Sequence, residues 1–347
     1  MKYFDYLSPS AQAAFSELCD IVSAKEMSRT VSSLSGSFHT KRINDRDYWY
    51  FQFRDLDGKS KHLYVGADSD RVRTLIERSK EKLEWNITPH VRASVSLGCE
   101  TLPREQFRVI KKLSDYGFFK AGGILVGTHA YVAAGNALGV KWVDVKMTQD
   151  IDFAHAGKRI SIALPSNIKV DVHGAIESLE MGFLPIKSFN GKLEASYINP
   201  KQPDFRIDFL TAKTGNSDTP IMAPGLNVAL QPLKFMEFSL ASPDQTTILS
   251  DSDAVVVNFP SPARMALHKL LVWGERKDRG KAAKDLRQAM AMIAYFKDNR
   301  PYEIVEAKEE LMSCGKGWVK RMNNAMEVLG KKDTELAGFL SKPVQRD

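Results

Sequence analysis

The chain has 347 residues, of which 43% are hydrophobic and 26% charged, a composition that excludes disorder as its main state. No apolar run approaches the roughly 20 residues that cross a bilayer, no signal peptide is visible at the start, and three scattered cysteines argue against a disulfide framework or a zinc site. The net charge of +7 matters only where cations cluster. We therefore expect a cytoplasmic protein of two or three domains without a membrane partner.

The first 95 residues predict a small α+β module. A helix begins near Pro9, and strand-forming aromatic residues fill 47–54. A turn at 55–58 and a returning strand at 62–66 complete a β-hairpin. A charged helix follows, with its apolar face on Val72, Leu75, Ile76 and Leu83.

Basic residues surround this aromatic hairpin: Lys41, Arg42, Arg46, Arg54, Lys59, Lys61 and His62. A sheet with basic edges and aromatic faces can hold a nucleic-acid backbone, and the pattern weakly resembles the arm-type DNA-binding sheets of integrases. The alternative is that the aromatic residues form the core of a small sheet whose charges keep it soluble. We favour the alternative, because every small sheet needs both features.

A phosphate-binding turn is predicted at Gly127-Thr128. The apolar run 122–126 ends abruptly there, and the residues that follow have helical character. Such a strand, tight turn and helix N-terminus presents backbone N–H groups and a hydroxyl to an anion. A glycine turn alone is weak evidence, because it also closes ordinary strand-to-helix loops.

Two aspartates follow on a second predicted strand. Alternation places Asp150 and Asp152 on one face, with Ile151 and Phe153 on the other. Neighbouring carboxylates repel each other unless a cation lies between them, and Mg²⁺ bound to substrate phosphates suits that position. A solvated strand edge is an equally good explanation of the pair taken alone.

A third carboxylate comes from Asp208, within the predicted strand 205–210. Aspartate disfavours strand interiors, so its presence there requires a reason. Asp171 competes for this role, but it directly precedes a predicted helix and N-capping explains it. We choose Asp208.

The last part of the chain predicts helices with a cationic stretch. Residues 264–287 hold eight basic and three acidic residues. We interpret most of these cations as a solvated helix face, and Lys269, whose neighbours are apolar, as a functional residue.

In their order along the chain, Gly127-Thr128, Asp150-Ile151-Asp152 and Asp208 resemble the DNA-polymerase-β-type nucleotidyltransferase superfamily, most closely its bacterial abortive-infection and toxin-type branches. The resemblance covers residues 104–290. It implies an α+β fold whose nucleotidyltransferase core, a mixed sheet with helices, spans 100–258. The N-terminal module (1–95) and a helical region (259–347) would flank this core.

The resemblance also implies a chemistry, namely transfer of a nucleoside monophosphate from an NTP to an acceptor hydroxyl with Mg²⁺ or Mn²⁺. It assigns catalysis and metal binding to Asp150, Asp152 and Asp208, and NTP binding to Gly127, Thr128 and Lys269. The acceptor would be RNA, with tRNA the leading example, or a protein hydroxyl, or a small molecule, in a toxin or phage-defence setting. Two other functions stay open: an inactive scaffold that binds nucleic acid or regulates, and an antitoxin or host-interaction module that acts through the N-terminal sheet.

Overall fold

The computed structural model describes residues 2–32, 36–54, 60–70, 72–73, 76–77, 86–143, 145, 147–156, 170–187 and 193–341. Several predicted features lie outside the described residues: the hairpin turn 55–58, Lys59, Leu75 and Leu83 of the charged helix, and the tail 342–347. Within the described part of the chain, no helix is long and apolar enough to cross a membrane.

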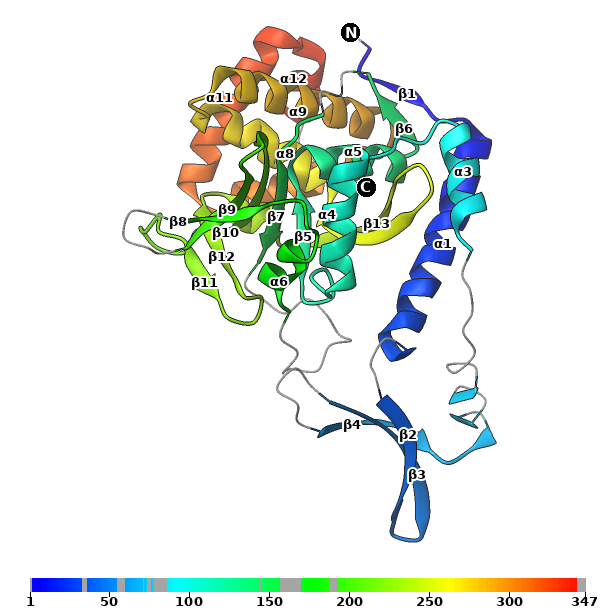
Figure 1. The fold of residues 1–347 in the computed structure, drawn as a ribbon. Coiled ribbons are helices and arrows are strands. Elements are labelled where there is room, and N and C mark those ends of the chain that lie inside the picture. Colours follow the sequence, from blue (N-terminus) through cyan, green and yellow to red (C-terminus); the bar gives the residue numbers. More distant parts are fainter. Residues whose placement is uncertain are drawn as a thin grey trace.

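A mixed seven-stranded sheet forms the centre of the molecule (Figure 1), which confirms the predicted α+β class. Five strands follow one path in the order β11 (Ile221–Ala223), β12 (Val228–Leu233), β10 (Gln202–Ala212), β7 (Ile151–His155) and β5 (Gly123–Val126). Strand β10 is long enough to pair with β9 (Leu193–Asn199) along its first part and with β12 along its second. Strand β8 (Leu184–Lys187) completes the sheet beside β9.

The register of the central strands decides where polar side chains meet. Strands β7 and β10 run parallel with Asp152 directly opposite Asp208, and Val126 at the end of β5 lies opposite Asp152. Alternation sends the neighbouring aromatic residues to the other face, where the Phe153 and Phe209 rings stack with their centroids 5.5 Å apart. One face of these strands therefore builds the core, and the other carries carboxylates.

Helices cover this sheet and continue its core. The helices around the sheet are, in chain order, α4 (Arg104–Asp115), α5 (Gly127–Ala137), α6 (Val172–Glu177) and α7 (Met236–Ser239). Helix α4 buries Phe107, Ile110 and Leu113, the apolar stripe that its sequence predicts.

The C-terminal region is helical, as predicted: α8 (Pro262–Val272), a short 3₁₀ turn η1 (Trp273–Glu275), α9 (Arg279–Asn299), α10 (Pro301–Ser313), α11 (Lys316–Lys332) and α12 (Thr334–Ser341). Its apolar side chains belong to the same hydrophobic cluster as the central sheet. The helices therefore pack as a continuation of the core and not as a detached bundle.

The N-terminal residues divide between the body and a projecting sheet. Strand β1 (Phe4–Tyr6) pairs with β6 (Val140–Trp142), and helices α1 (Pro9–Ser32) and α3 (Thr88–Ser96) pack on the hairpin of β13 (Pro243–Leu249) and β14 (Ala254–Pro260). The sequence analysis placed all of residues 1–95 in one module. The structure differs, because the apolar stripe of α1 is covered by side chains from the hairpin more than 200 residues later.

The projecting part is a three-stranded antiparallel sheet of β2 (Gly36–Ile43), β3 (Arg46–Arg54) and β4 (Ser60–Ala67). It lies beyond the far end of α1, apart from the central sheet (Figure 1).

Candidate active site

The glycine turn after β5 has a geometry that only glycine fits. Gly127 has φ +71°, in the left-handed region, and a Cβ built on it would lie 2.2 Å from Oδ2 of Asp152. Its lack of a side chain lets the carboxylate of the neighbouring strand approach the first turn of α5. The predicted turn and the predicted carboxylate are therefore one structural unit.

The structure brings the three predicted aspartates to one cavity. Asp150 directly precedes β7, Asp152 lies within β7, and Asp208 lies beside Asp152 on β10. Ser196 Oγ on β9 donates a hydrogen bond of 2.5 Å to Oδ1 of Asp208. Asp171, the competing candidate, caps α6 and accepts a hydrogen bond from the Gly174 N–H.

The carboxylates have opposed electrostatic environments. Burial, together with the charges of Asp150 and Asp208, raises the pKa of Asp152 to about 7. Burial also acts to raise the pKa of Asp150, but Thr148 and the ammonium groups of Lys281 and Lys284 outweigh it and lower that pKa. A cation at the cavity would offset both the burial of the Asp152 carboxylate and its repulsion by Asp150 and Asp208.

This carboxylate cluster fits a divalent cation that arrives with substrate. Within the described residues, no three His, Cys, Asp or Glu side chains are arranged as a ready metal site. Mg²⁺ does not need one, because it typically uses one or two carboxylates together with phosphate oxygens and water. Asp150 and Asp152 supply hard oxygen ligands of this kind, and the raised pKa of Asp152 marks a place where positive charge is lacking.

Two lysines of α9 approach the turn and the carboxylates. Lys284 Nζ donates a hydrogen bond of 3.1 Å to Thr128 Oγ1, and Lys281 Nζ lies 3.7 Å from Oδ2 of Asp150. The sequence analysis placed both among the cations of a solvated face. Their spacing of three residues places them on one face of α9, but nothing in the sequence of α9 shows that this face meets the turn.

Lys269, the predicted phosphate ligand, lines the cavity but has a buried partner. The residue is 7% exposed, and its Nζ lies 3.1 Å from Oδ1 of Asp285. The other oxygen of Asp285 accepts a hydrogen bond of 2.9 Å from Arg276 Nε. Asp285 therefore fixes both cations along this wall, and the charge of Lys269 is largely balanced before any ligand binds.

The cavity has about 620 Å³ of volume, in the range of small-molecule sites. Its lining joins three kinds of surface. Asp150, Asp152 and Asp208 lie on or next to the central strands, most of the cations come from α8, α9 and the residues between them, and the apolar wall includes Leu210, Leu233, Met236, Met265 and Val272. Such a lining offers ligands for a metal and phosphates together with apolar surface.

Two histidines near the cavity carry no charge at neutral pH. Burial is the largest cause that lowers the pKa of both His129 and His268 to about 4. His268 lines the cavity, and among the described residues its Nε2 has no hydrogen-bond partner; the same holds for both ring nitrogens of His129. A neutral imidazole can donate or accept, so His268 is a polar contact that the sequence analysis did not assign.

A strained residue forms another part of the wall. Phe235 has φ +67°, unusual for a side chain of this size, and it lines the cavity at the start of α7. Trp318 of α11 holds its ring at a centroid distance of 4.8 Å, and the Arg321 guanidinium lies 4.9 Å from the ring. The C-terminal helices thus hold this wall in a conformation that costs about 1–3 kcal/mol.

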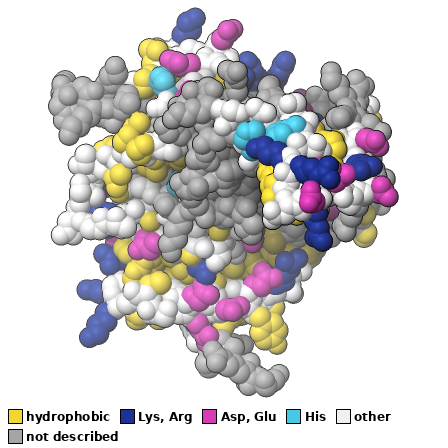
Figure 2. Space-filling view, turned by 90° about the horizontal axis from the view of Figure 1, so that it is seen from below, with side chains coloured by type: hydrophobic (Ala, Val, Ile, Leu, Met, Phe, Trp, Pro, Cys, Tyr) yellow, Lys and Arg dark blue, Asp and Glu magenta, His cyan; other side chains and the backbone are white. Residues whose placement is uncertain are grey.

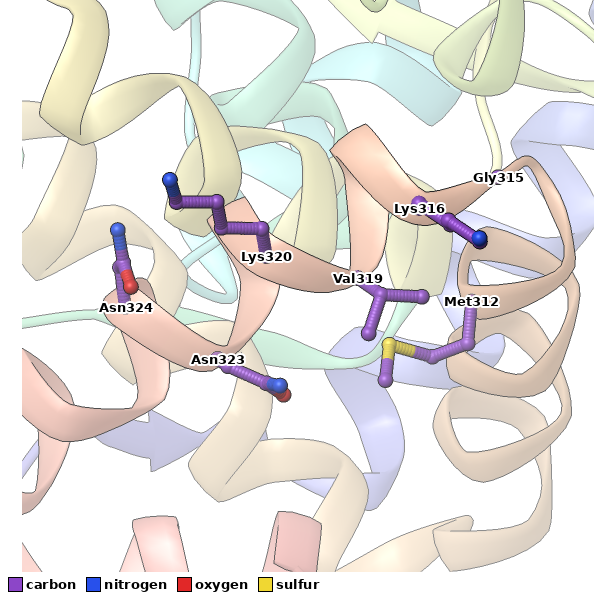
Figure 3. A pocket seen from close by; sticks show the side chains of 7 residues that line it. All are labelled: Met312, Gly315, Lys316, Val319, Lys320, Asn323 and Asn324. Atoms are coloured by element: carbon purple, nitrogen blue, oxygen red, sulfur yellow. The ribbon is translucent and has the colours of Figure 1, made fainter.

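A second cavity lies on the outer side of α11 (Figure 3). It has about 590 Å³ of volume and is lined by Met312, Gly315, Lys316, Val319, Lys320, Asn323 and Asn324. Its lining includes no carboxylate, so it lacks the ligands that metal-assisted chemistry requires.

A mixed sheet with aspartates on two parallel strands, beside a glycine–threonine turn that opens a helix, is typical of the nucleotidyltransferase class. Comparison with known proteins agrees: a family model described as nucleotidyltransferase matches residues 104–313, more than half of the chain. The chain belongs to this nucleotidyltransferase family. The matched region contains the turn, the three aspartates and the lysines of α9.

Other comparisons add little. A search of curated proteins found no match. Among solved structures, the chain resembles the crystal structure of an antigenic nucleotidyltransferase-like protein from Paracoccidioides brasiliensis, with 15% identity over 71% of this chain and 97% of that one. The TM-score of this pair is 0.35. The family model is what identifies the chain as a nucleotidyltransferase family member.

Proposed function

We propose that this protein is an active, metal-dependent nucleotidyltransferase that moves a nucleoside monophosphate from an NTP to an acceptor hydroxyl. One observation carries the proposal: Asp150, Asp152 and Asp208 share a cavity with Lys281, whose helix also sends Lys284 to the Gly127-Thr128 turn. Family membership supports nucleotidyl transfer in general, and this cluster supports catalytic activity in this chain.

The reaction forms one P–O bond and breaks another. The oxygen of the acceptor hydroxyl attacks the α-phosphorus in line, and the bond from that phosphorus to the bridging oxygen of the β-phosphate breaks, releasing pyrophosphate. Asp208 accepts the proton of the attacking hydroxyl. Bound Mg²⁺ or Mn²⁺ would neutralise charge on the phosphates and align them, held by Asp150 and Asp152, with Asp208 completing a second metal position.

The residues of the turn and of α9 bind the leaving group. Gly127 lines the cavity and Thr128 is buried next to it, so the backbone N–H groups of this turn would bind the β- and γ-phosphates. Lys284, hydrogen-bonded to the Thr128 hydroxyl, brings positive charge to the same turn. Lys269 of α8 contributes from the same cationic wall, through a charge shared with Asp285. These groups are fixed before substrate binds, which is how preorganised charge lowers a barrier.

We further propose RNA as the acceptor, with a protein hydroxyl as the second candidate, in a toxin or phage-defence role. The support is electrostatic. The chain carries a net charge of +7, and the cationic stretch 264–287 forms one wall of the cavity, so a polyanionic acceptor is attracted to it.

The test is label transfer from each α-³²P-NTP with Mg²⁺, with total RNA, total protein or no acceptor. The Asp150→Asn and Asp208→Asn variants should lose the label while remaining folded. Asp171→Asn is the matched control, because it removes an aspartate that caps α6 and lies outside the cavity lining. Label on protein alone would support nucleotidyl transfer but show that the acceptor is a protein hydroxyl and not RNA. Equal labelling by wild type and the Asp150→Asn variant would refute the proposed site.

An inactive scaffold makes the opposite prediction. It would bind nucleotide or nucleic acid, transfer no label in any lane, and be indifferent to Asp150→Asn. The cluster argues against it, since three mutually repelling carboxylates serve no purpose in a protein that never binds a cation there.

A further inference from the structure

The projecting sheet of β2, β3 and β4 sorts its side chains onto two unlike faces. On one face Phe38 and Phe51 pack together with ring centroids 4.8 Å apart, and Phe51 is only 5% exposed. Trp49, on this same face, donates a hydrogen bond of 2.7 Å to Asp68. These residues form the small core that the sequence analysis favoured as the explanation of the aromatic residues.

The opposite face is not explained by a core. We call it the tyrosine face; strand alternation and register place His39, Lys41, Arg46, Tyr48, Tyr50, His62 and Tyr64 on it. Tyr64 is 60% exposed, and its ring centroid lies 5.6 Å from that of Tyr50 and 6.1 Å from that of Tyr48. Three tyrosine rings therefore form one continuous patch that reaches solvent.

Cations accompany these rings. Lys41 Nζ lies 5.1 Å from the centre of the Tyr50 ring, and Arg46 and His62 are exposed. The nearby carboxylates do not lie on the tyrosine face. Asp47 lies on the opposite face of the sheet, and Oδ1 of Asp45, in the turn, lies 4.0 Å from Nε of Arg42, which is also on the opposite face. Among the described residues, the tyrosine face carries positive charge without a carboxylate. Figure 2, which shows the molecule from this end, has histidine and basic side chains gathered close together on the surface.

We propose that the tyrosine face binds single-stranded nucleic acid. Unpaired bases stack on Tyr48, Tyr50 and Tyr64, and the neighbouring cations neutralise the phosphates between them. Exposed aromatic rings on a sheet suit splayed bases and not a duplex, whose bases are already stacked on one another. Binding needs neither NTP nor the three aspartates of the cavity, so this inference goes beyond the proposed transfer reaction.

The experiment is fluorescence anisotropy with labelled single-stranded RNA and DNA of mixed sequence, about ten nucleotides long, and with a duplex of the same sequence. We expect single strands to bind better than the duplex. Tyr64→Ala should weaken the binding at least roughly fivefold, and Tyr64→Phe, which keeps the ring, should restore it. RNA and DNA bound equally would indicate stacking and phosphate contacts, and a preference for RNA would add contacts to the 2′-hydroxyl.

Lys41 and Arg42 provide a control matched in charge and position. They are adjacent in β2, both exposed, and on opposite faces. Lys41→Ala should weaken binding and reduce its salt dependence, whereas Arg42→Ala should do neither. Equal losses from the two variants would mean that net charge and not this face causes binding, and would overturn the proposal.

Two further outcomes also decide the matter. If no oligonucleotide binds, or if Tyr64→Ala binds as wild type does, the tyrosine face is not a nucleic-acid surface and a protein partner becomes its occupant. The Asp150→Asn variant should bind strands normally, which separates failure of this inference from failure of the transfer reaction. Circular dichroism of each variant verifies that the sheet is folded.

Discussion

Asp152→Asn should make the metal-free protein more stable at high pH, although it removes a residue of the proposed active site. Burial and the neighbouring charges of Asp150 and Asp208 raise the pKa of Asp152 to about 7, whereas an aspartate in the unfolded chain titrates near 4. Between these values the folded protein holds a proton that the unfolded chain has released. The free energy of unfolding therefore falls as pH rises through this window. Above pH 7, where Asp152 is ionised in the folded protein, the loss of stability reaches its full size.

The magnitude follows from the shift. About three pKa units at about 1.36 kcal/mol each give up to about 4 kcal/mol of destabilisation by ionised Asp152. Asparagine has nearly the same shape and no charge to desolvate. The Asp152→Asn variant should thus gain up to about 4 kcal/mol over wild type at about pH 8.5, and almost nothing at about pH 4.

Urea unfolding in the presence of a chelator, at both pH values, measures this difference. Asp171→Asn provides a control of opposite sign. The Gly174 N–H and the Asn227 side chain lower the pKa of Asp171, so ionised Asp171 stabilises the fold above its unfolded pKa, and this stabilisation is lost as pH falls. Asp171→Asn should therefore be destabilising at high pH. The raised pKa of Asp152 would be refuted if Asp152→Asn were no more stable than wild type at about pH 8.5, or if its gain in free energy of unfolding were the same at about pH 4 and about pH 8.5.

Three other variants test the geometry of the site. Gly127→Ala should abolish label transfer, because the alanine Cβ would displace the Asp152 carboxylate. It should also lower the free energy of unfolding by about 1–2 kcal/mol, because alanine is strained at φ +71°. The label-transfer assay measures the first effect and urea unfolding the second. Asp285→Ala should cost about 3–5 kcal/mol in thermal or urea unfolding, since it leaves the buried Lys269 ammonium unpaired, and an unchanged midpoint would contradict that role. Lys284→Met should raise the KM for NTP at unchanged fold stability, and a normal KM would remove this lysine from the phosphate site.

The parts of the site that sequence reasoning located depend on short-range signals. Strand alternation placed Asp152 and Asp208 away from the aromatic core, and the abrupt end of an apolar run located the Gly127 turn. A single strand pairing, that of β7 with β10, was then enough to bring the carboxylates together. Their roles in catalysis remain predictions, but their proximity follows from local patterns.

The parts that it missed depend on how distant segments meet. Lys284 reaches the Thr128 hydroxyl across 156 residues of sequence, and no pattern within α9 specifies that approach. The boundary predicted at residue 95 has the same origin. Phe15, Leu18 and Val22 lie at helical spacing in α1, but the sequence does not show that Leu249 and Ala254 will cover them. In both cases the sequence indicates which face needs a partner and leaves the partner open.

The electrostatics of the cavity bear on the choice between an enzyme and an inactive scaffold. The glycine in a left-handed conformation lets the Asp152 carboxylate approach the helix turn, where burial and the neighbouring charges of Asp150 and Asp208 raise its pKa. A scaffold without catalysis would be more stable with asparagine at that position and would lose nothing. A metal–nucleotide complex bound as we propose would change the balance, because its cation would reduce the repulsion and its phosphates would lie at the turn beside Lys284. The destabilising arrangement is therefore best understood as a site built for the loaded state, with substrate binding supplying the charge that the free protein lacks.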